Sequence, residues 1–230
     1  MNKTSALNES SSSDRADRLV NLPACIDYLE TTGNLIRVKN EVDPEYELAG
    51  IMQKSYKSGC GKAVLFERVK NSAYPVLSGM LLNRDVVASI FGVAANEVSS
   101  FMGKALESWR QDKDLYPSLV LENGPANEII AETVDLYSLP VPIHALKDGG
   151  RYFNSSVMIV KNPETGVPNI SLRRFMVTGK DRMTFLVDPE RHLGEYLAIA
   201  EARNEPLPIT LNIGMGPAVW FAAAMPKQGE

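Results

Sequence analysis

The spacing of hydrophobic and polar positions follows two different patterns along the 230 residues. From about Leu22 to Leu121, helical and strand spacings alternate, which is typical of a small α/β unit. The expected elements there are a helix at 44–56, strands at 63–69 and 74–81, and a short helix between Asn83 as N-cap and Gly92. A helical stripe also predicts core positions at Val98, Met102, Ala105, Leu106 and Trp109.

The pattern changes after the turn-forming segment Glu122-Asn123-Gly124-Pro125. Beyond it, short β-type runs predict strands at 128–134, 152–161, 169–178, 183–188 and 207–214, the last followed by an apolar segment at 217–224. Gly179-Lys180-Asp181 predicts a hairpin turn, and closely spaced hairpins favour a small barrel or sandwich. One helix interrupts the strands, with Asp188 as N-cap, Pro189 at its first position, and a buried face of Leu193, Tyr196, Leu197 and Ala200.

We therefore expect an α+β protein in three parts. Residues 1–18 form a polar tail that is expected to be disordered, 19–122 an N-terminal α/β domain, and 123–230 a β-rich domain. The tail has no apolar stretch typical of a signal peptide, and its acidic residues argue against a transit peptide.

Composition narrows the class of partner. With 24 Lys+Arg against 28 Asp+Glu, the net charge is −4 and no basic block is present, which argues against a nucleic-acid partner. No apolar run approaches the roughly 18 residues of a membrane helix. Cys25 and Cys60 lie outside any CxxC pattern and are interpreted as ordinary thiols, so we expect a cytoplasmic protein.

Arg191 and His192 form the first candidate site. Both fall in the first turn of the helix expected after Asp188, where free backbone N–H groups favour an anion, so a bound phosphate or carboxylate would explain two cationic residues there. The alternative is structural: Arg191 pairs with Glu195 and His192 is a surface group.

Arg174 is the second candidate. Alternation along the strand places it on the same, most apolar face as Ile170, Leu172 and Met176, so its burial would require a carboxylate or phosphate, from the protein or from a ligand. Asn169 is five positions away and faces the opposite side of a regular strand, so a site that uses both residues needs a bulge or bend.

Two other features of the sequence are weaker candidates for a functional site. Gly214-Met215-Gly216-Pro217 lacks a complete phosphate-loop pattern, and the Met and aromatic residues around Trp220 are interpreted as core. No GxSxG motif is present to argue for a serine nucleophile.

Several segments together resemble the UbiD family of reversible decarboxylases, which use prenylated FMN. The resemblance is carried by residues 169–176, Arg191-His192 and Ala222-Ala223-Ala224-Met225-Pro226, and looser similarity extends over 43–49, 135–140, 148–152 and 208–217. It implies an N-terminal α/β unit followed by a flavin-binding split β-barrel. In such enzymes the flavin is the electron sink while CO₂ leaves, and an acidic residue returns a proton.

The resemblance also implies roles for individual residues. Asn169 and His192 would be ligands of a divalent metal, Mn²⁺ or Mg²⁺, that bridges to the cofactor phosphate, with K⁺ as a further cation. Arg174 would be the catalytic arginine. The cofactor would be lined by Asn169, Ile170, Ser171, Leu172, Arg173, Arg174, Arg191, His192, Ala223, Ala224, Met225 and Pro226.

The sequence departs from the family pattern near its end. The family's metal-binding glutamate and catalytic acids lie after the Met-Pro element, whereas this sequence ends at Glu230. Alanines 223 and 224 stand where some relatives have serines. We therefore expect an incomplete barrel and little or no activity from these 230 residues alone, with the full-length form a homo-oligomer.

The resulting hypothesis is a carboxy-lyase that non-oxidatively decarboxylates an aromatic or α,β-unsaturated carboxylic acid with prenylated FMN. One alternative is a non-catalytic flavin- or phosphate-binding module, or a subunit that needs a partner chain. Another is that Arg174 and His192 are structural.

Overall fold

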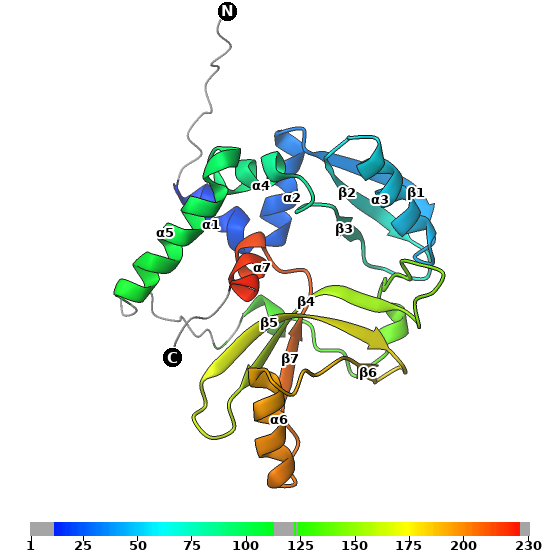
Figure 1. Ribbon diagram of the computed structural model, residues 1–230. Coiled ribbons are helices and arrows are strands. Elements are labelled where there is room, and N and C mark those ends of the chain that lie inside the picture. Colours follow the sequence, from blue (N-terminus) through cyan, green and yellow to red (C-terminus); the bar gives the residue numbers. More distant parts are fainter. Residues whose placement is uncertain (1–11, 113–121, 123, 226–230) are drawn as a thin grey trace, which may run out of the picture.

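Two β-sheets organise the protein. The computed structural model describes residues 12–112, 122 and 124–225, and Figure 1 shows the smaller sheet with its helices above a larger curled sheet. The architecture is mixed α/β, in agreement with the expected class, and the larger sheet curls as a half-barrel.

The first sheet has the order β1-β2-β3. Its strands are β1 (Leu35–Val42), β2 (Ala63–Val69) and β3 (Val76–Ser78), with β1 and β2 parallel and β3 antiparallel to β2. Helix α3 (Glu47–Lys57) connects the parallel strands, as a crossover between parallel strands requires. Leu48 of α3 packs with Val42, Val64, Phe66 and Val69 in a core on this sheet.

Four helices form a second core beside this sheet. They are α1 (Ser12–Val20), α2 (Leu22–Thr31), α4 (Arg84–Phe91) and α5 (Val98–Gln111), with a 3₁₀ turn at Ala95–Glu97. Helix α4 begins and ends as predicted: Asn83 accepts a hydrogen bond from Asp85 N at 2.8 Å, and Gly92 adopts a left-handed conformation at φ 66°.

Helix α1 corrects the prediction of a disordered tail. Residues 12–18 are helical, and Arg18 is only 4% exposed because its Nε donates to Ile90 O at 2.8 Å and its guanidinium lies 4.2 Å from the Tyr28 ring centroid. A charged segment is thus ordered by contacts with distant residues, which its low hydrophobicity does not reveal. Residues 1–11 lie outside the described residues.

The second sheet is antiparallel throughout, with the order β6-β5-β4-β7. It comprises β4 (Tyr152–Lys161), β5 (Pro168–Val177), β6 (Met183–Thr184) and β7 (Ile209–Asn212). Helix α6 (His192–Ala202) packs against one face, where Leu193 and Tyr196 join Met158, Val160 and Phe175 in a core. The predicted hairpin at 179–181 is confirmed by the bond from Thr178 N to Arg182 O, 3.0 Å.

Helix α7 (Pro217–Ala224) lies between the two parts (Figure 1). It packs against β5 and α1, and its Phe221 ring meets Phe91 edge-on at 5.1 Å between centroids. A second connection joins the turn before α3 to the segment before β4. Tyr46 N donates to Ile143 O at 3.0 Å, and Arg151 pairs with Glu45 at 2.9 Å.

Two further predictions about secondary structure need correction in the described residues. The strand expected at 128–134 is wrong, because this segment pairs with no described strand and exposes Ile129 (88%) and Ile130 (81%). The stripe predicted on α5 is confirmed at Val98 and Met102, which belong to the core or pack against it, but not at Ala105 and Trp109, which are exposed because the helix extends past the core (Figure 1).

None of the described helices is by itself long and apolar enough to cross a membrane. Helix α4 and residues 95–111 have the length and composition of a span only when taken together, and they are bent by 82° relative to each other.

Candidate functional site

Asn169 and His192 meet at the start of β5. They are 23 positions apart in sequence, yet Asn169 Nδ2 lies 3.3 Å from His192 Nδ1. Strand β5 carries Asn169 as its second residue, and His192 is the first residue of α6. An amide can be turned to present its oxygen instead of its nitrogen, so the pair offers one amide oxygen and one imidazole nitrogen to a common ligand.

Two buried polar atoms continue this site along β5. Ser171 Oγ and Arg173 Nε are buried and have no hydrogen-bond partner among the described residues. Both alternate with Asn169, so the three side chains form a row on one face of the strand. Burying such atoms without partners is costly, and a guanidinium is always charged, so this face fits an anionic ligand that accepts hydrogen bonds.

Arg191 precedes the site in a turn rather than in a helix. The helix begins at His192 with Arg191 as N-cap, so the prediction that Asp188 is the N-cap is wrong. Instead, Asp188 Oδ1 accepts from Glu190 N at 3.1 Å and closes a turn over 188–191. Arg191 pairs with Asp188 at 3.5 Å, not with Glu195 as in the structural alternative, and 74% of its side chain remains exposed.

Arg174 lies on the other face of β5. Burial alternates along the whole strand, so the predicted grouping with Ile170 and Leu172 is confirmed. The predicted burial of this face is wrong, since Ile170 is 38% and Leu172 39% exposed, and Arg174 is exposed too. Within the described residues no ion pair or side-chain hydrogen bond reaches Arg174, and the sheet separates it from the Asn169–His192 pair.

The irregularity expected near these residues occurs in the neighbouring strand. The register of β4 on β5 runs from Phe153 opposite Phe175 to Ser156 opposite Arg173. Asn154 and Ser155 therefore form a bulge that lies opposite Arg174. Strand β5 itself keeps its alternation.

The residues fit a phosphate better than they fit a complete metal site. In the described part of the chain there is no group of three or more His, Cys, Asp or Glu side chains arranged to hold a metal ion. Asn169 and His192 supply two ligands, so a cation there needs others, such as phosphate oxygens.

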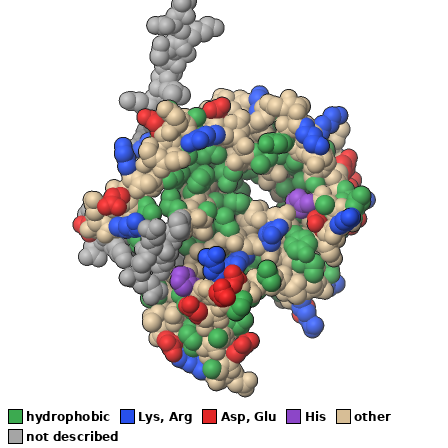
Figure 2. Space-filling model, in the orientation of Figure 1, with side chains coloured by type: hydrophobic (Ala, Val, Ile, Leu, Met, Phe, Trp, Pro, Cys, Tyr) green, Lys and Arg blue, Asp and Glu red, His purple; other side chains and the backbone are tan. Residues whose placement is uncertain are grey.

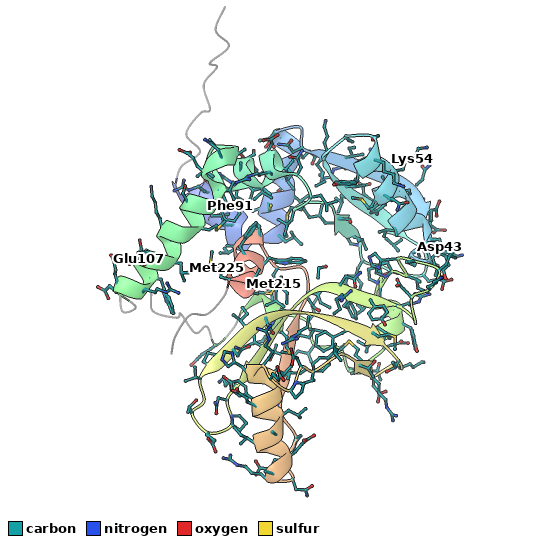
Figure 3. The ribbon with its side chains drawn as sticks, in the orientation of Figure 1. Asp43, Lys54, Phe91, Glu107, Met215 and Met225 are labelled. Atoms are coloured by element: carbon teal, nitrogen blue, oxygen red, sulfur yellow. The ribbon has the colours of Figure 1, made fainter. Side chains whose placement is uncertain are left out.

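The remaining predicted cofactor residues lie at the end of α7. Figure 3 shows Met215 and Met225 beside this helix, between the two sheets. Ala223 and Met225 are half-buried and Ala224 is exposed. Pro226 and Glu230 lie outside the described residues.

A cavity of about 650 Å³ opens between the first sheet and β4. Figure 2 shows a hollow with largely hydrophobic walls at the centre of this face of the molecule. Trp220, predicted to be core, lines the cavity together with the bulge residues Asn154 and Ser155, and His144 lies there too. Sequence reasoning missed this group, because the bulge at Asn154 and Ser155 depends on how β4 pairs with β5, which the sequence of β4 alone does not reveal.

Two domain models of one family match the chain. Residues 26–106 match the N-terminal domain of 3-octaprenyl-4-hydroxybenzoate carboxy-lyase, and residues 119–229 match its Rift-related domain. Together with the fold, these matches define a member of a carboxy-lyase family. The chain belongs to the UbiD family, as the resemblance predicted.

Individual relatives agree with this assignment. The chain is 46% identical over 210 residues to the uncharacterized protein of the cooM 5′ region of Rhodospirillum rubrum, covering 91% of this chain and 44% of that protein. Identity to the anhydromevalonate phosphate decarboxylase of Methanothermobacter thermautotrophicus is 32% over 185 residues, or 80% of this chain and 41% of the relative.

A solved structure gives the same result. The UbiD-class enzyme HmfF from Pelotomaculum thermopropionicum, in an evolved dimeric form in complex with prFMN, superposes with a TM-score of 0.78 at 34% identity. The match covers 90% of this chain and 47% of HmfF. The chain therefore spans less than half the length of the proteins it matches.

Proposed function

We propose that this chain is the cofactor-holding part of a UbiD-type carboxy-lyase that reversibly and non-oxidatively decarboxylates an aromatic or α,β-unsaturated acid with prenylated FMN. The observation that carries the proposal is the row of Asn169, Ser171 and Arg173 on one face of β5, with His192 beside it. Family membership and the similarity to a flavin-bound enzyme support it.

The cofactor phosphate is assigned to the buried polar atoms on β5. Arg173 Nε and Ser171 Oγ are donors without partners, and phosphate oxygens would satisfy both. Arg191, at the start of α6, adds a second positive charge near free backbone N–H groups. Ile170, Leu172 and residues 223–226 are assigned to the rest of the flavin.

Asn169 and His192 are assigned to a divalent cation that bridges to this phosphate. An amide oxygen with an imidazole nitrogen suits Mn²⁺ or Mg²⁺, and the phosphate would complete part of the coordination. K⁺ is proposed as an accompanying cation. These roles follow the family resemblance, and the 3.3 Å contact between the two side chains is compatible with them.

Arg174 is assigned to the carboxylate of the substrate. It is exposed, unpaired in the described residues and unable to lose its charge. A guanidinium favours the ionised form of a carboxylic acid, so Arg174 would bind the acid as an anion and orient it. When bound, the prenylated flavin supplies the electron sink for loss of CO₂.

The same proposal includes the domain division at 19–122 and 123–230, a complete split barrel and homo-oligomerisation. So does low turnover by these 230 residues alone, since the family's catalytic acids would have to come from other residues or a partner chain. Cys25 and Cys60 are free thiols, in keeping with the cytoplasm. Clear CO₂ release by the purified chain reconstituted with cofactor would contradict the low-turnover part of the proposal.

Measurements of flavin binding test directly whether the row of Asn169, Ser171 and Arg173, with His192 beside it, holds the phosphate. FMN and riboflavin differ by the phosphate, so equilibrium dialysis against both isolates its contribution. We expect Arg173→Met, Asn169→Ala and His192→Ala each to weaken FMN binding by about tenfold or more, since hydrogen bonds to charged groups contribute about 1.5–3 kcal/mol. Riboflavin affinity should not change.

The matched control is Lys161→Ala, an exposed position at the end of β4 that pairs with Pro168. Mn²⁺ should tighten FMN binding by the wild type but not by Asn169→Ala. Equal affinity for FMN and riboflavin, or unchanged FMN binding in the three variants, would contradict the assignment.

A further inference from the structure

Arg174 has no hydrogen-bonded partner in the described residues that would hold its side chain in one direction. Its side chain is exposed on the face of β5 that is turned away from α6. An arginine side chain has many rotamers, so the one that meets a carboxylate has to be favoured by the surrounding structure. The support for this residue must therefore come from the backbone around it and from the neighbouring strand.

The neighbouring strand is irregular opposite Arg174. Phe153 and Ser156 of β4 both pair with residues on the α6 face of β5, although they are three positions apart. Asn154 and Ser155, between them, are left opposite Arg174, and both line the cavity. A bulge of this kind changes the direction of nearby side chains, so its geometry also sets the surroundings of Arg174.

One end of the bulge is tied to the backbone of Arg174. Ser156 is 1% exposed, and its Oγ donates to Arg173 O at 2.7 Å. That carbonyl belongs to the peptide group that joins Arg173 to Arg174. The backbone at Arg174 is therefore fixed from the side of Ser156, and the other end of the bulge needs a separate contact.

His144 provides the contact at the other end of the bulge. Asn154 Nδ2 lies 3.1 Å from His144 Nδ1 and 3.2 Å from Nε2. Burial lowers the pKa of His144 below its ordinary value, against the smaller opposing effect of Asp148. A neutral imidazole has one accepting nitrogen, and the amide of Asn154 can donate to it.

His144 can hold the bulge because its own backbone is anchored on two sides. Asp148 Oδ2 accepts from His144 N at 3.2 Å and from Ala145 N at 3.0 Å. On the other side, Ile143 N donates to Pro44 O at 3.1 Å, in the turn before α3. The loop therefore connects the first sheet and its helix α3 to the bulge.

We propose that His144 is a positioning residue for Arg174: through Asn154 it fixes the bulge of β4, and with it the direction of the guanidinium. The proposal deepens the proposed function and rests on it, because it takes Arg174 as the group that binds the substrate carboxylate. It also gives the N-terminal part of the chain a role at the site, since the loop of His144 is anchored there.

The direct test follows the Arg174 side chain itself. Its Nε–Hε resonance in ¹⁵N-labelled protein is assigned by its absence in Arg174→Lys. His144→Ala and Asn154→Ala should each shift this resonance, whereas His144→Gln, which keeps an acceptor for Asn154, should return it toward the wild-type position. Lys161→Ala, at the exposed last residue of β4, is the matched control and should leave the resonance unchanged.

A double-variant cycle shows whether His144 acts through Asn154. If it does, His144→Ala combined with Asn154→Ala shifts the Arg174 resonance no further than one substitution alone. An unmoved resonance in the single variants, or two shifts that add in the double variant, would overturn the proposal. If His144→Ala does not fold, Asn154→Ala carries the same test at an exposed position.

Ligand binding separates this proposal from the assignment of Arg174 to the substrate carboxylate. Benzoate and benzamide have nearly the same shape, and only benzoate is charged. Calorimetric titration of the wild type should give a Kd for benzoate about tenfold below that for benzamide. His144→Ala should lose most of this preference, with the Kd for benzamide unchanged, and His144→Gln should keep it.

The two outcomes can be told apart. If the wild type shows no preference for benzoate while the Arg174 resonance still moves in His144→Ala, the carboxylate assignment fails and the positioning role stands. If the preference is present in the wild type and survives unchanged in His144→Ala, the positioning role is overturned and the carboxylate assignment stands.

Discussion

Gly194 is packed directly against the backbone of Asp188. A Cβ on Gly194 would lie 2.5 Å from Asp188 O and equally close to Pro189 Cα, both of which are backbone atoms. The turn that carries Arg191 therefore rests on the first turn of α6. This contact fixes where His192 emerges beside Asn169.

Gly194→Ala should therefore disturb both stability and the site. The backbone cannot yield as a flexible side chain would, so we expect a loss of about 1–3 kcal/mol in the free energy of unfolding by urea. FMN binding should weaken as well, because His192 moves. Gly50→Ala, in α3 with open space around it, is the control; similar stability of both variants would contradict the packing argument.

A second close contact joins the two ends of the described chain. A Cβ on Gly216 would lie 2.4 Å from Val20 C and 2.6 Å from Leu19 O. Gly216→Ala should separate α7 from α1 and lower the melting temperature by several degrees. Gly103→Ala, in an open position of α5, should instead raise stability by about 0.5–1 kcal/mol, as alanine does in a helix. An unchanged melting temperature in Gly216→Ala would contradict the close packing of Gly216 against Val20 and Leu19.

Local signals explain what the sequence could predict. Asn83 and Gly92 define α4 because capping depends on neighbouring residues alone, and the alternation of β5 depends only on strand geometry. The exposure of Arg174, the bulge at Asn154 and the burial of Arg18 depend instead on which distant elements pack together. Periodicity does not contain that information, so the cavity and its histidine could not be predicted.

The two thiols should differ in reactivity. Cys25 is fully buried with its Sγ 3.6 Å from Met80 Sδ, and burial raises its pKa to about 11. At pH 8 the native protein should react with a thiol reagent at Cys60 and only slowly at Cys25. Cys60→Ala should abolish the fast phase, and unfolding should restore reaction at Cys25. Two equally fast thiols in the native state would contradict this prediction.

His144 should titrate below the ordinary histidine range. Because its folded-state pKa is lowered from 6.5, the stability linked to its neutral form is present above that value and is lost as the pH falls through the folded-state pKa. Proton NMR titration of the ring protons should give a midpoint below 6.5, assigned by its absence in His144→Gln. A midpoint at or above 6.5 would show that the ring is not desolvated.

The face of β5 with Asn169, Ser171 and Arg173 is proposed to hold a prenylated flavin through its phosphate. The most direct measurement is mass spectrometry of the native protein after reconstitution with prenylated FMN and gel filtration, for the wild type and the Asn169→Ala, His192→Ala double variant. The wild-type chain should retain one prenylated flavin, and the double variant should lose it. Retention by both proteins, or by neither, would contradict it.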